Sequence, residues 1–462
     1  MEFPYGKAPL AILILALVSG GLLLLQRVTA RERPDLILQT FALQHVPGLE
    51  LAARDFYAKT GKRVEIQLVD QRALQSRLQA SLQSGAAVPD LVELLESSMG
   101  VFTKGPLEDV GFIDLTDRLK AGGWMDKLVQ SRFSLWSSRG RIFALPHDVH
   151  PVMLAYRRDL VEQLGIDVSK LTTWEEFVRV GREVTRDLNG DGVPDRYMLD
   201  MFIGGGGTLQ ILLLQRDISV LDENGLVAYD REETADVIEW YIRQVTGKDR
   251  IAFECGWGQT LYKAMIDGLC LFYFCPDWRS KSFAAEVPSL AGKMALMPLP
   301  AWHEGGRRTS VWGGTGLAIT RQTADPELAW EFAMYAYYTP QYLGRRFAAN
   351  YILPPLKEAW SLPELNEPDP YYSGQKRGAM YAALAPETPV RHVSPFISLA
   401  DSKLNEAYTN ALTYFERNGE AGWREYIRSE LKRTADQVRA QIARNRFYRT
   451  AAPEPVSAGG ER

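Results

Sequence analysis

The segment Gly140–Tyr197 constrains the fold more than any other part of the chain. It reads GRIFALPHDVHPVMLAYRRDLVEQLGIDVSKLTTWEEFVRVGREVTRDLNGDGVPDRY. Two short apolar runs, Ile142–Leu145 and Val152–Tyr156, flank the polar loop HDVH, and Pro146 ends the first of them. We therefore predict two strands that pair around this loop, with polar groups gathered where the chain crosses from one to the other.

Two helices are predicted after the second apolar run. Asp159 is placed to accept hydrogen bonds from the free N–H groups of Leu160–Leu164, and Gly165 favours the left-handed conformation that ends a helix. Thr173 and Glu176 have the spacing of a capping box. The helix that this box opens has apolar residues at helical spacing, namely Trp174, Phe177, Val180 and Val184.

Strand and helix patterns alternate along the rest of the chain. Further strands are predicted at Leu36–Thr40, Val64–Val69 and Pro89–Leu95. Asp230 with Glu233 and, later, Asp325 are expected to cap two more helices. This alternation predicts an α/β fold with parallel sheets and helices on both faces.

Length and charge narrow the class further. A chain of 462 residues exceeds what one hydrophobic core supports, so two lobes are expected. Lys and Arg number 53 against 57 Asp and Glu, and no basic block is present, so nucleic acid is not expected as a partner. We expect a monomer.

The first 34 residues require a separate explanation. Ala8–Leu25 contains no charged residue and, as a helix, would span roughly 27 Å, close to the thickness of a membrane core. It is longer than the apolar part of a cleavable signal peptide, although Val28-Thr29-Ala30 resembles a cleavage site. We therefore predict an uncleaved transmembrane helix over this segment.

Two further observations bear on this anchor. No cysteine precedes Cys255, which excludes anchoring as a lipoprotein. Arg27, Arg31 and Arg33 follow the apolar run with only Lys7 before it, and this charge bias alone would place the body of the protein inside the cell. At the other end of the chain, residues 448–462 are expected to be a disordered tail rich in Pro, Gly, Ala and Ser.

A series of motifs resembles one family in its order along the chain. The motifs are PDLVELLESSMG (Pro89–Gly100), GFIDLTDRL (Gly111–Leu119), DGLCLFYFCPDWR (Asp267–Arg279), MPLPAW (Met297–Trp302), WGGTGLAIT followed by DPELAWEFAMY (Trp312–Tyr335) and NYILPPLKEAW (Asn350–Trp360). Together with the opening segment they resemble the bacterial extracellular solute-binding proteins of family 1, the sugar receptors of ABC importers. The resemblance implies a receptor that faces the extracytoplasmic side of the membrane, binds a carbohydrate and delivers it to a membrane permease.

The resemblance also implies a two-lobed periplasmic-binding-protein fold with three crossings between the lobes. We expect the crossings near Leu145–Asp148, Ser310–Gly314 and Asn350–Leu353, where proline or paired glycines interrupt the pattern. Residues 1–34 would form the anchor, 35–146 with 312–350 one lobe, and 147–311 with 351–447 the other. The ligand would lie between the lobes, which close around it by a hinge motion.

Sugar recognition requires aromatic rings against the apolar face of the sugar and planar polar groups at its rim. By resemblance, Trp278 is the first candidate for a stacking ring, and its alternative is a ring packed behind the hinge. Other candidates follow the predicted strands or lie at the crossings, where open α/β sheets bind ligands; they are Gln44, His45, Glu96, Ser97, His147, Asp148, His150, Trp312, Gly313 and Tyr351. For each, a structural hydrogen bond or a solvated loop position is an equal alternative.

The segment from Asp187 to Asp195 has part of a calcium-binding pattern. Asp187, Asn189, Asp191 and Asp195 occupy positions 1, 3, 5 and 9 of such a loop, and glycine stands at position 6. Met198 stands where the bidentate glutamate of a complete site belongs. The sequence leaves open a structural calcium ion and a surface turn rich in Asp, Asn and Gly; no other cofactor is expected.

No catalytic motif was found, since HExxH, GxSxG and Walker sequences are absent. Cys255, Cys270 and Cys275 lack zinc-ligand spacing, and any disulfide pairing among them is undetermined by the sequence. Two alternatives stay open: a ferric-ion receptor using Tyr337-Tyr338 or Tyr371-Tyr372, and a carbohydrate-cleaving enzyme using Glu96 and Asp148 as paired carboxylates.

Overall fold

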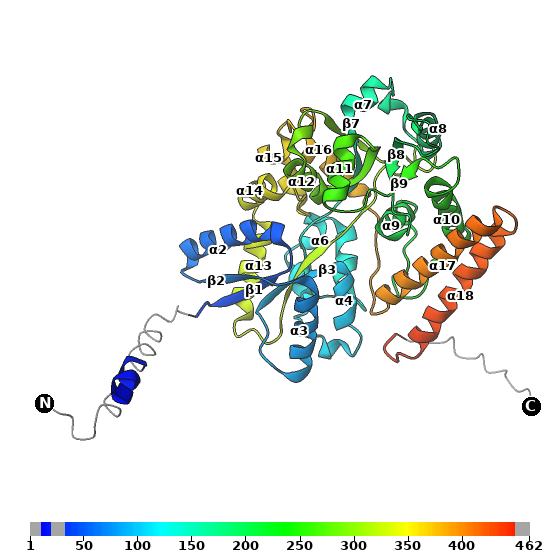
Figure 1. Cartoon of the computed structure of the whole chain (residues 1–462). Coiled ribbons are helices and arrows are strands. Elements are labelled where there is room, and N and C mark those ends of the chain that lie inside the picture. The colour runs from blue at the N-terminus through cyan, green and yellow to red at the C-terminus, as the bar shows by residue number, and fades with distance from the viewer. Residues whose placement is uncertain (1–10, 20–32, 449–462) are drawn as a thin grey trace, which may run out of the picture.

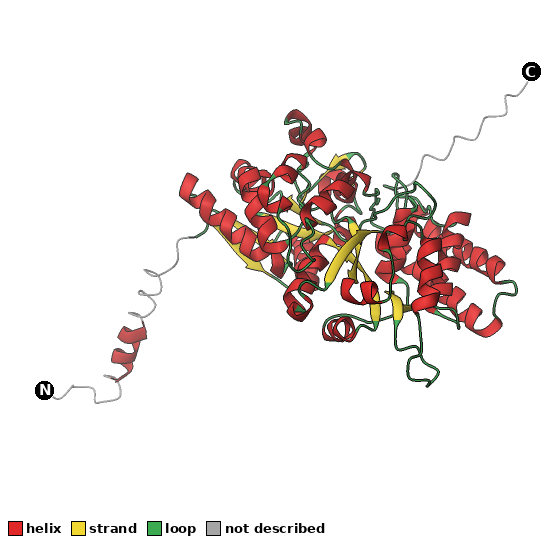
Figure 2. Cartoon of the chain, turned by 90° about the horizontal axis from the view of Figure 1, so that it is seen from above, coloured by secondary structure: helices red, strands yellow, loops and turns green. Residues whose placement is uncertain are grey.

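The structure is a computed structural model that describes residues 11–19 and 33–448. The body consists of two α/β lobes, each built on a five-stranded sheet (Figure 1). The strands lie inside and helices surround them, as the view in Figure 2 shows.

The first lobe contains a sheet of order β2-β1-β3-β12-β6. Its strands are β1 (Leu36–Thr40), β2 (Val64–Leu68), β3 (Leu91–Leu95), β6 (Leu145–Pro146) and β12 (Thr315–Ile319). The helices of this lobe are α2 (Val46–Thr60), α3 (Gln71–Ser84), α4 (Glu96–Phe102), α5 (Thr116–Ala121), α6 (Trp124–Lys127) and α13 (Pro326–Tyr338).

The second lobe contains a sheet of order β11-β7-β10-β8-β9. Its strands are β7 (Val152–Arg157), β8 (Tyr197–Asp200), β9 (Ala252–Phe253), β10 (Cys270–Pro276) and β11 (Met294–Pro298). Its helices are α7 (Arg158–Gln163), α8 (Trp174–Val184), α9 (Gly206–Gln215), α10 (Glu232–Val245), α11 (Gln259–Asp267), α12 (Asp277–Glu286), α15 (Pro363–Asn366), α16 (Arg377–Leu384), α17 (Ile397–Asn418) and α18 (Trp423–Ala443).

Each sheet is covered on both faces, which explains why its strands read as nearly continuous apolar runs. In β10, for example, Phe272 and Phe274 pack into one apolar cluster, whereas Tyr273 and Cys275 pack into another on the opposite face. All seven residues of this strand are buried. The cost of ordering the chain is therefore offset on both sides of the sheet by apolar burial.

Three connections join the lobes. Residues 147–151 lead from β6 in the first sheet to β7 in the second, and residues 299–314 lead from β11 back to β12. Helix α14 (Pro340–Asn350) makes the third passage, because Tyr342 packs in the core of the first lobe and Phe347 packs in that of the second.

The predicted pairing of two strands around HDVH is wrong. Strand β6 pairs with β12 and strand β7 pairs with β10 and β11, so the loop passes between sheets instead of turning within one. The sheets are also mixed, not purely parallel, because β12 runs antiparallel to β3 and β7 antiparallel to β10. Neighbouring parallel strands need a long crossover connection within the lobe. Strands β7 and β12 instead enter their sheets from the other lobe, and they run antiparallel to β10 and β3.

The predicted helix caps are confirmed in part. Thr173 and Glu176 form the capping box of α8, and Asp325 caps α13. Asp159 and Asp230 are not side-chain caps in the structure. They form ion pairs with Arg157 and Arg439 instead, since a guanidinium offers two aligned donors to a carboxylate.

Of the predicted transmembrane segment, only residues 11–19 are described, and they are helical. Within the described residues, we find no helix with the length and apolarity needed to cross a membrane. The rest of Ala8–Leu25, and the predicted tail after residue 448, lie outside the described residues.

Candidate functional site

Four aromatic rings gather on the side of the second lobe that faces the connections. They are Phe202, Trp257, Trp278 and Trp312, which come from four separate segments of the chain. Trp257 and Trp278 are nearly parallel, at 15°, with centroids 6.5 Å apart, and Trp312 lies 5.6–5.7 Å from both. Trp257 is 53% exposed, and the other three rings are partly buried.

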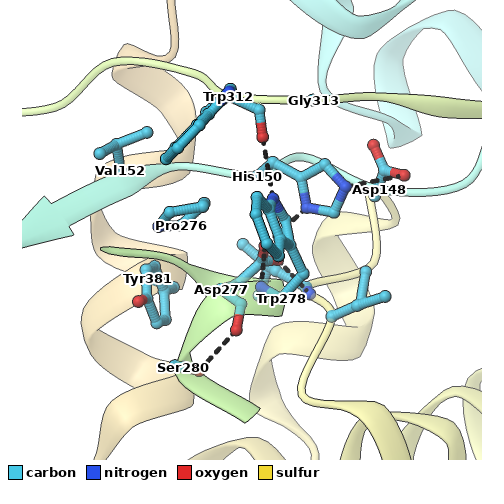
Figure 3. A network of polar contacts seen from close by, with 12 residues as sticks. Asp148, His150, Val152, Pro276, Asp277, Trp278, Ser280, Trp312, Gly313 and Tyr381 are labelled. Atoms are coloured by element: carbon cyan, nitrogen blue, oxygen red, sulfur yellow. Dashed lines mark hydrogen bonds and ion pairs between the residues drawn. The ribbon is translucent and has the colours of Figure 1, made fainter. Parts of the chain in front are cut away.

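The structure fixes Trp278 at the start of α12, directly after β10. Its indole Nε1 donates to the backbone oxygen of Trp312 at 3.0 Å (Figure 3). The ring is partly buried, and its neighbour Asp277 is fully buried. The orientation of Trp278 is thus set by the second connection, which carries Trp312.

Trp257 is held between two glycines, Gly256 and Gly258, with φ angles of +75° and +61°. This left-handed backbone is readily adopted only by glycine, and it turns the indole outward. Beneath the ring lies the buried guanidinium of Arg279, 5.0 Å from the Trp257 centroid and 5.5 Å from that of Trp312. Cation–π attraction at such distances contributes about 0.5–2 kcal/mol.

A cavity of about 360 Å³, lined mainly by apolar side chains, lies between α9 and α17, close to the aromatic cluster. Its lining includes the side chains of Gln210, Arg391, Asp401 and Asn405. Arg391 donates to Glu96 of the first lobe and, at 3.0 Å, to Asp401 of the second. The cavity therefore lies against an ion pair that spans both lobes.

Glu96, Arg391 and Asp401 form a charged triad, and burial and the neighbouring charges shift the pKa values of Arg391 and Asp401. Burial opposes the charged form of Arg391, but the carboxylates of Glu96 and Asp401 outweigh it and raise the arginine pKa. Burial also raises the pKa of Asp401. Groups held this way present fixed, planar donors and acceptors, which are suited to sugar hydroxyls.

The first turn of α9 joins the aromatic cluster to the cavity. A Cβ added to Gly207 would lie 2.8 Å from Nε1 of Trp312, so only glycine allows this ring to pack against the start of this helix. The N–H of Gly206 donates to Asn405 of the cavity at 3.3 Å. Aromatic faces and polar groups thus form one continuous surface.

A buried network lies behind this surface and contacts all three connections. His150 is held between two carboxylates, at 3.1 Å from Asp148 and 2.6 Å from Asp277 (Figure 3). Asp148 also accepts from the N–H of Thr315, and Asp277 accepts from the N–H of Leu353. The network therefore ties the first connection to Thr315, the first residue after the second connection, and to Leu353, which follows α14.

The network is electrically balanced. Arg132 donates to Asp148 at 3.2 Å and to the backbone oxygen of Gly313 at 2.8 Å, so two cations face two anions. Burial alone would lower the pKa of His150, but Asp148 and Asp277 raise it to about 10. His150 has a φ of +57°, a strained conformation that these contacts stabilise.

A second network lies in the first lobe beneath the connection. The fully buried Glu93 accepts from Thr40 at 2.5 Å, from His45 at 2.9 Å and from Tyr337 at 2.5 Å. The ring of His147 stacks on that of His45 with centroids 4.0 Å apart. Burial, together with the charge of His45, lowers the pKa of His147 to about 3.

This low value predicts acid sensitivity. The unfolded chain binds a proton on His147 below about pH 6.5, whereas the folded protein does not until about pH 3. Stability is therefore lost as the pH falls through this window, by up to about 1.4 kcal/mol per pH unit. We expect the free energy of unfolding in urea to depend less on pH between 6.5 and 4.5 for His147→Gln than for the wild type. The exposed His303→Gln should show the same pH dependence as the wild type. Equal pH dependence in all three proteins would contradict the low pKa of His147.

Eight of the eleven predicted ligand-binding residues lie in the aromatic cluster, in the triad or in the two buried networks. Trp278, Trp312 and Gly313 lie in or beside the aromatic cluster, and Glu96 lies in the triad. His45, His147, Asp148 and His150 are buried in the two networks. We therefore interpret these four as residues that position the connections, and their contact with ligand stays a prediction.

Three remaining candidates lie apart from the cluster. Gln44 is exposed in a short 3₁₀ helix after β1, and Ser97 is in the first turn of α4. Tyr351 packs on the guanidinium of Arg377, 3.4 Å from the ring centroid, and on Lys281. The structure does not bring these three together with Trp278.

The segment 187–195 forms an exposed turn in which the acidic side chains accept from its own backbone. Asp187 accepts from the N–H groups of Gly190 and Gly192, and Asp195 accepts from those of Leu188 and Asn189. Within residues 11–19 and 33–448, the grouping of potential metal ligands found is His45, Glu93 and His147. In that grouping Glu93 already accepts three hydrogen bonds and the two imidazoles stack face to face.

The tyrosine pairs and the paired carboxylates are engaged elsewhere. Tyr337 and Tyr372 are fully buried, and burial raises the pKa of both phenols. Glu96 pairs with Arg391, whereas Asp148 pairs with Arg132 and His150. Both carboxylates are thus paired with buried cations.

Sequence reasoning missed several residues of this surface. The sequence Gly256-Trp257-Gly258 could have indicated Trp257, because a large ring between two glycines is typical of an exposed loop, where core packing does not explain it. Phe202, Arg391 and Asp401 had none, because only the fold brings these distant segments together.

Aromatic rings and buried polar groups thus lie together beside the connections between the two lobes. Residues 44–341 match the family model described as bacterial extracellular solute-binding protein. The chain therefore belongs to this family, which places it on the extracytoplasmic side, as the resemblance implied.

Individual relatives are similar over most of their length. The arabinooligosaccharide-binding protein of Halalkalibacterium halodurans is 29% identical over 348 residues, covering 73% of this chain and 75% of that protein. The protein of the same name from Bacillus subtilis is 26% identical over 300 residues, covering 64% and 67%. The structure of the sugar-binding protein MalE from Xanthomonas citri has a TM-score of 0.70 at 16% identity and covers 88% of this chain and 98% of its own, which shows the shared fold.

Proposed function

We propose that this protein is the carbohydrate receptor of an ABC importer and that its ligand is an oligosaccharide. The observation that carries the proposal is the aromatic cluster of Phe202, Trp257, Trp278 and Trp312 beside the cavity at Arg391. Successive ring centroids lie 5.5–6.5 Å apart, which provides stacking surface for more than one sugar unit. The names of the two relatives make arabino-oligosaccharides the first ligands to test.

Recognition would use the two halves of the surface differently. The rings contribute apolar contact with the sugar faces, and Gln210, Asp401 and Asn405 contribute hydrogen bonds at the rim. Because Arg391 links Glu96 to Asp401, ligand that enters here reaches groups of both lobes. We propose that the lobes close about the three connections and deliver the sugar to a membrane permease, without chemical turnover.

A thermal-shift series tests the function. Arabino-oligosaccharides of increasing length, with arabinose, maltotriose and galactobiose as comparisons, are added to the purified protein. A ligand at 100 times its dissociation constant stabilises the folded state by about 2.7 kcal/mol. A rise in melting temperature with any oligosaccharide, together with unchanged sugar by chromatography, supports a receptor; product formation would indicate an enzyme.

We also propose that Ala8–Leu25 anchors the protein in the membrane. The motivation is the uncharged run itself, since an uncleaved segment of this length suits a membrane core. The mature protein should sediment with membranes and resist extraction at high salt. An N-terminus at Arg31, found by sequencing the mature protein, would show cleavage after Ala30 and contradict the anchor.

A structural calcium ion at Asp187, Asn189, Asp191 and Asp195 stays a prediction. If calcium binds, it must replace the hydrogen bonds that these carboxylates now accept from backbone N–H groups. Calcium should then raise the melting temperature of the wild type, and Asp191→Ala should abolish that rise. An identical melting temperature with calcium and with chelator would contradict the site.

A further inference from the structure

Two of the three cysteines lie in contact within the second lobe. The Sγ atoms of Cys255 and Cys270 are 3.3 Å apart, and both side chains are buried. Cys270 is the first residue of β10, whereas Cys255 follows β9 at the base of the loop that carries Trp257. This contact joins a central strand of the sheet to an exposed loop of the candidate site.

The third cysteine has a different environment. The Sγ of Cys275 contacts the backbone oxygen of Pro276 and the hydroxyl of Tyr381, each at 3.7 Å. It lies five residues beyond Cys270 on an extended strand, roughly 16 Å away. Burial raises the pKa of this thiol to about 12 and also raises that of Cys270, so distance, and not acidity, separates Cys275 from the other two thiols.

We propose that Cys255 and Cys270 form a disulfide bond in the extracytoplasmic protein and that this bond fixes the loop bearing Trp257. Adjacent thiols persist as a disulfide in an oxidising compartment, which is where the family is located. A small side-chain rotation brings two sulfurs from contact to bonding distance, about 2.05 Å. The structure therefore assigns the pair that sequence spacing left undetermined.

The oxidation is a two-electron exchange with a protein disulfide or another disulfide oxidant. The thiolate of one cysteine attacks the oxidant disulfide and forms a mixed disulfide, and one oxidant sulfur leaves as a thiolate. The second cysteine then attacks the protein sulfur of that bond and releases the other oxidant sulfur. Both protein thiols lose their protons, two electrons pass to the oxidant, and the reduced oxidant leaves as a dithiol.

The consequence for Trp257 rests on the proposed carbohydrate site. Residues 256–258 contain two glycines in the left-handed region, and the indole is 53% exposed even though it contacts three other rings and Arg279. A covalent link two residues before the indole restricts the positions that the ring samples. Restricting a loop in its bound arrangement increases affinity, because less ordering remains to be done on binding.

Peptide mapping tests the bond without any ligand. Trypsin releases Ile251–Lys263, with Cys255, and Ala264–Arg279, with both other cysteines. The full chain exported to the oxidising compartment, digested without reduction, should give these two peptides linked. The linkage should persist in Cys275→Ala and disappear in Cys270→Ala; linkage that survives in Cys270→Ala, or three free thiols in the unreduced denatured wild type, would overturn the proposal.

A second measurement separates this bond from the carbohydrate site. Reduction and alkylation, or Cys255→Ala with Cys270→Ala, should lower the melting temperature by about 3–4 °C, because opening a loop of about 15 residues costs about 3 kcal/mol and a body of about 400 residues shifts by roughly 1 °C per kcal/mol. Where the wild type binds an arabino-oligosaccharide, the same treatments should weaken binding by about 3- to 10-fold. No change in melting temperature on reduction would contradict the bond, whereas absence of sugar binding in every form, with the linked peptide present, would contradict only the proposed function.

Discussion

Replacing Trp278 with alanine is expected to weaken oligosaccharide binding by about 30- to 1,000-fold, which corresponds to roughly 2–4 kcal/mol. The indole stands among three other rings and its N–H is bonded to the second connection. Its removal takes away stacking area and frees Trp312 to move. Isothermal titration calorimetry on the variant and the wild type measures the loss directly.

Trp360 provides a matched control for this experiment. It is also partly buried and its Nε1 donates to a backbone oxygen, that of Pro354, at 2.9 Å. Trp360→Ala should cost stability in the same range but leave sugar affinity unchanged. If Trp278→Ala instead lowers stability by roughly 3–5 kcal/mol, the cost of an emptied core position, and leaves affinity intact, Trp278 belongs to the core and the stacking role is wrong.

Replacing Asp277 with alanine is expected to lower the free energy of unfolding by about 3–5 kcal/mol. The fully buried carboxylate accepts hydrogen bonds from His150, from the N–H of Trp278 and from the N–H of Leu353. Its loss leaves those donors unpaired and removes one of the two anions that stabilise charged His150. Urea unfolding followed by tryptophan fluorescence measures the change.

Two comparisons define what this loss means. Asp369 is buried and paired with Arg377 in the second lobe, at 2.9 Å, so Asp369→Ala removes an ion pair without touching the Asp148–His150–Asp277 network. Asp277→Asn keeps the size of the side chain but should lower the pKa of His150 from about 10, observed by NMR of the imidazole. An unchanged His150 pKa in Asp277→Asn, or a loss below about 1 kcal/mol in Asp277→Ala, would contradict the role of this network.

Local sequence signals predicted elements well where the determinant was also local. The capping box at Thr173 and Glu176 lies within one turn of helix, and the strand Leu36–Thr40 was recognised from its apolar run. By contrast, Ile142–Leu145 and Val152–Tyr156 looked like a hairpin because periodicity does not reveal the partner of a strand. Only the pairing of β6 with β12, from far along the chain, separates them into two lobes.

The candidate site was predicted only where one segment carried the signal. Trp278 and Trp312 follow from motifs, and both lie in the aromatic cluster. His150 and Asp148 were polar residues at a crossing, and sequence alone could not distinguish ligand contact from the buried ion pairs that the fold creates with Arg132 and Asp277. Arg391 meets Glu96 across almost 300 residues, a contact that only the fold creates.

The most direct test of the carbohydrate-receptor assignment is calorimetric titration of the full-length protein, in detergent, with arabino-oligosaccharides of increasing length. We predict saturable binding of one oligosaccharide per chain, with affinity that rises from arabinose to the longer oligomers and falls by at least about 30-fold in Trp278→Ala. The absence of binding heat and of any thermal shift across arabino-, malto- and galacto-oligosaccharides, with the protein folded, would contradict the assignment of the aromatic cluster and its cavity to carbohydrate.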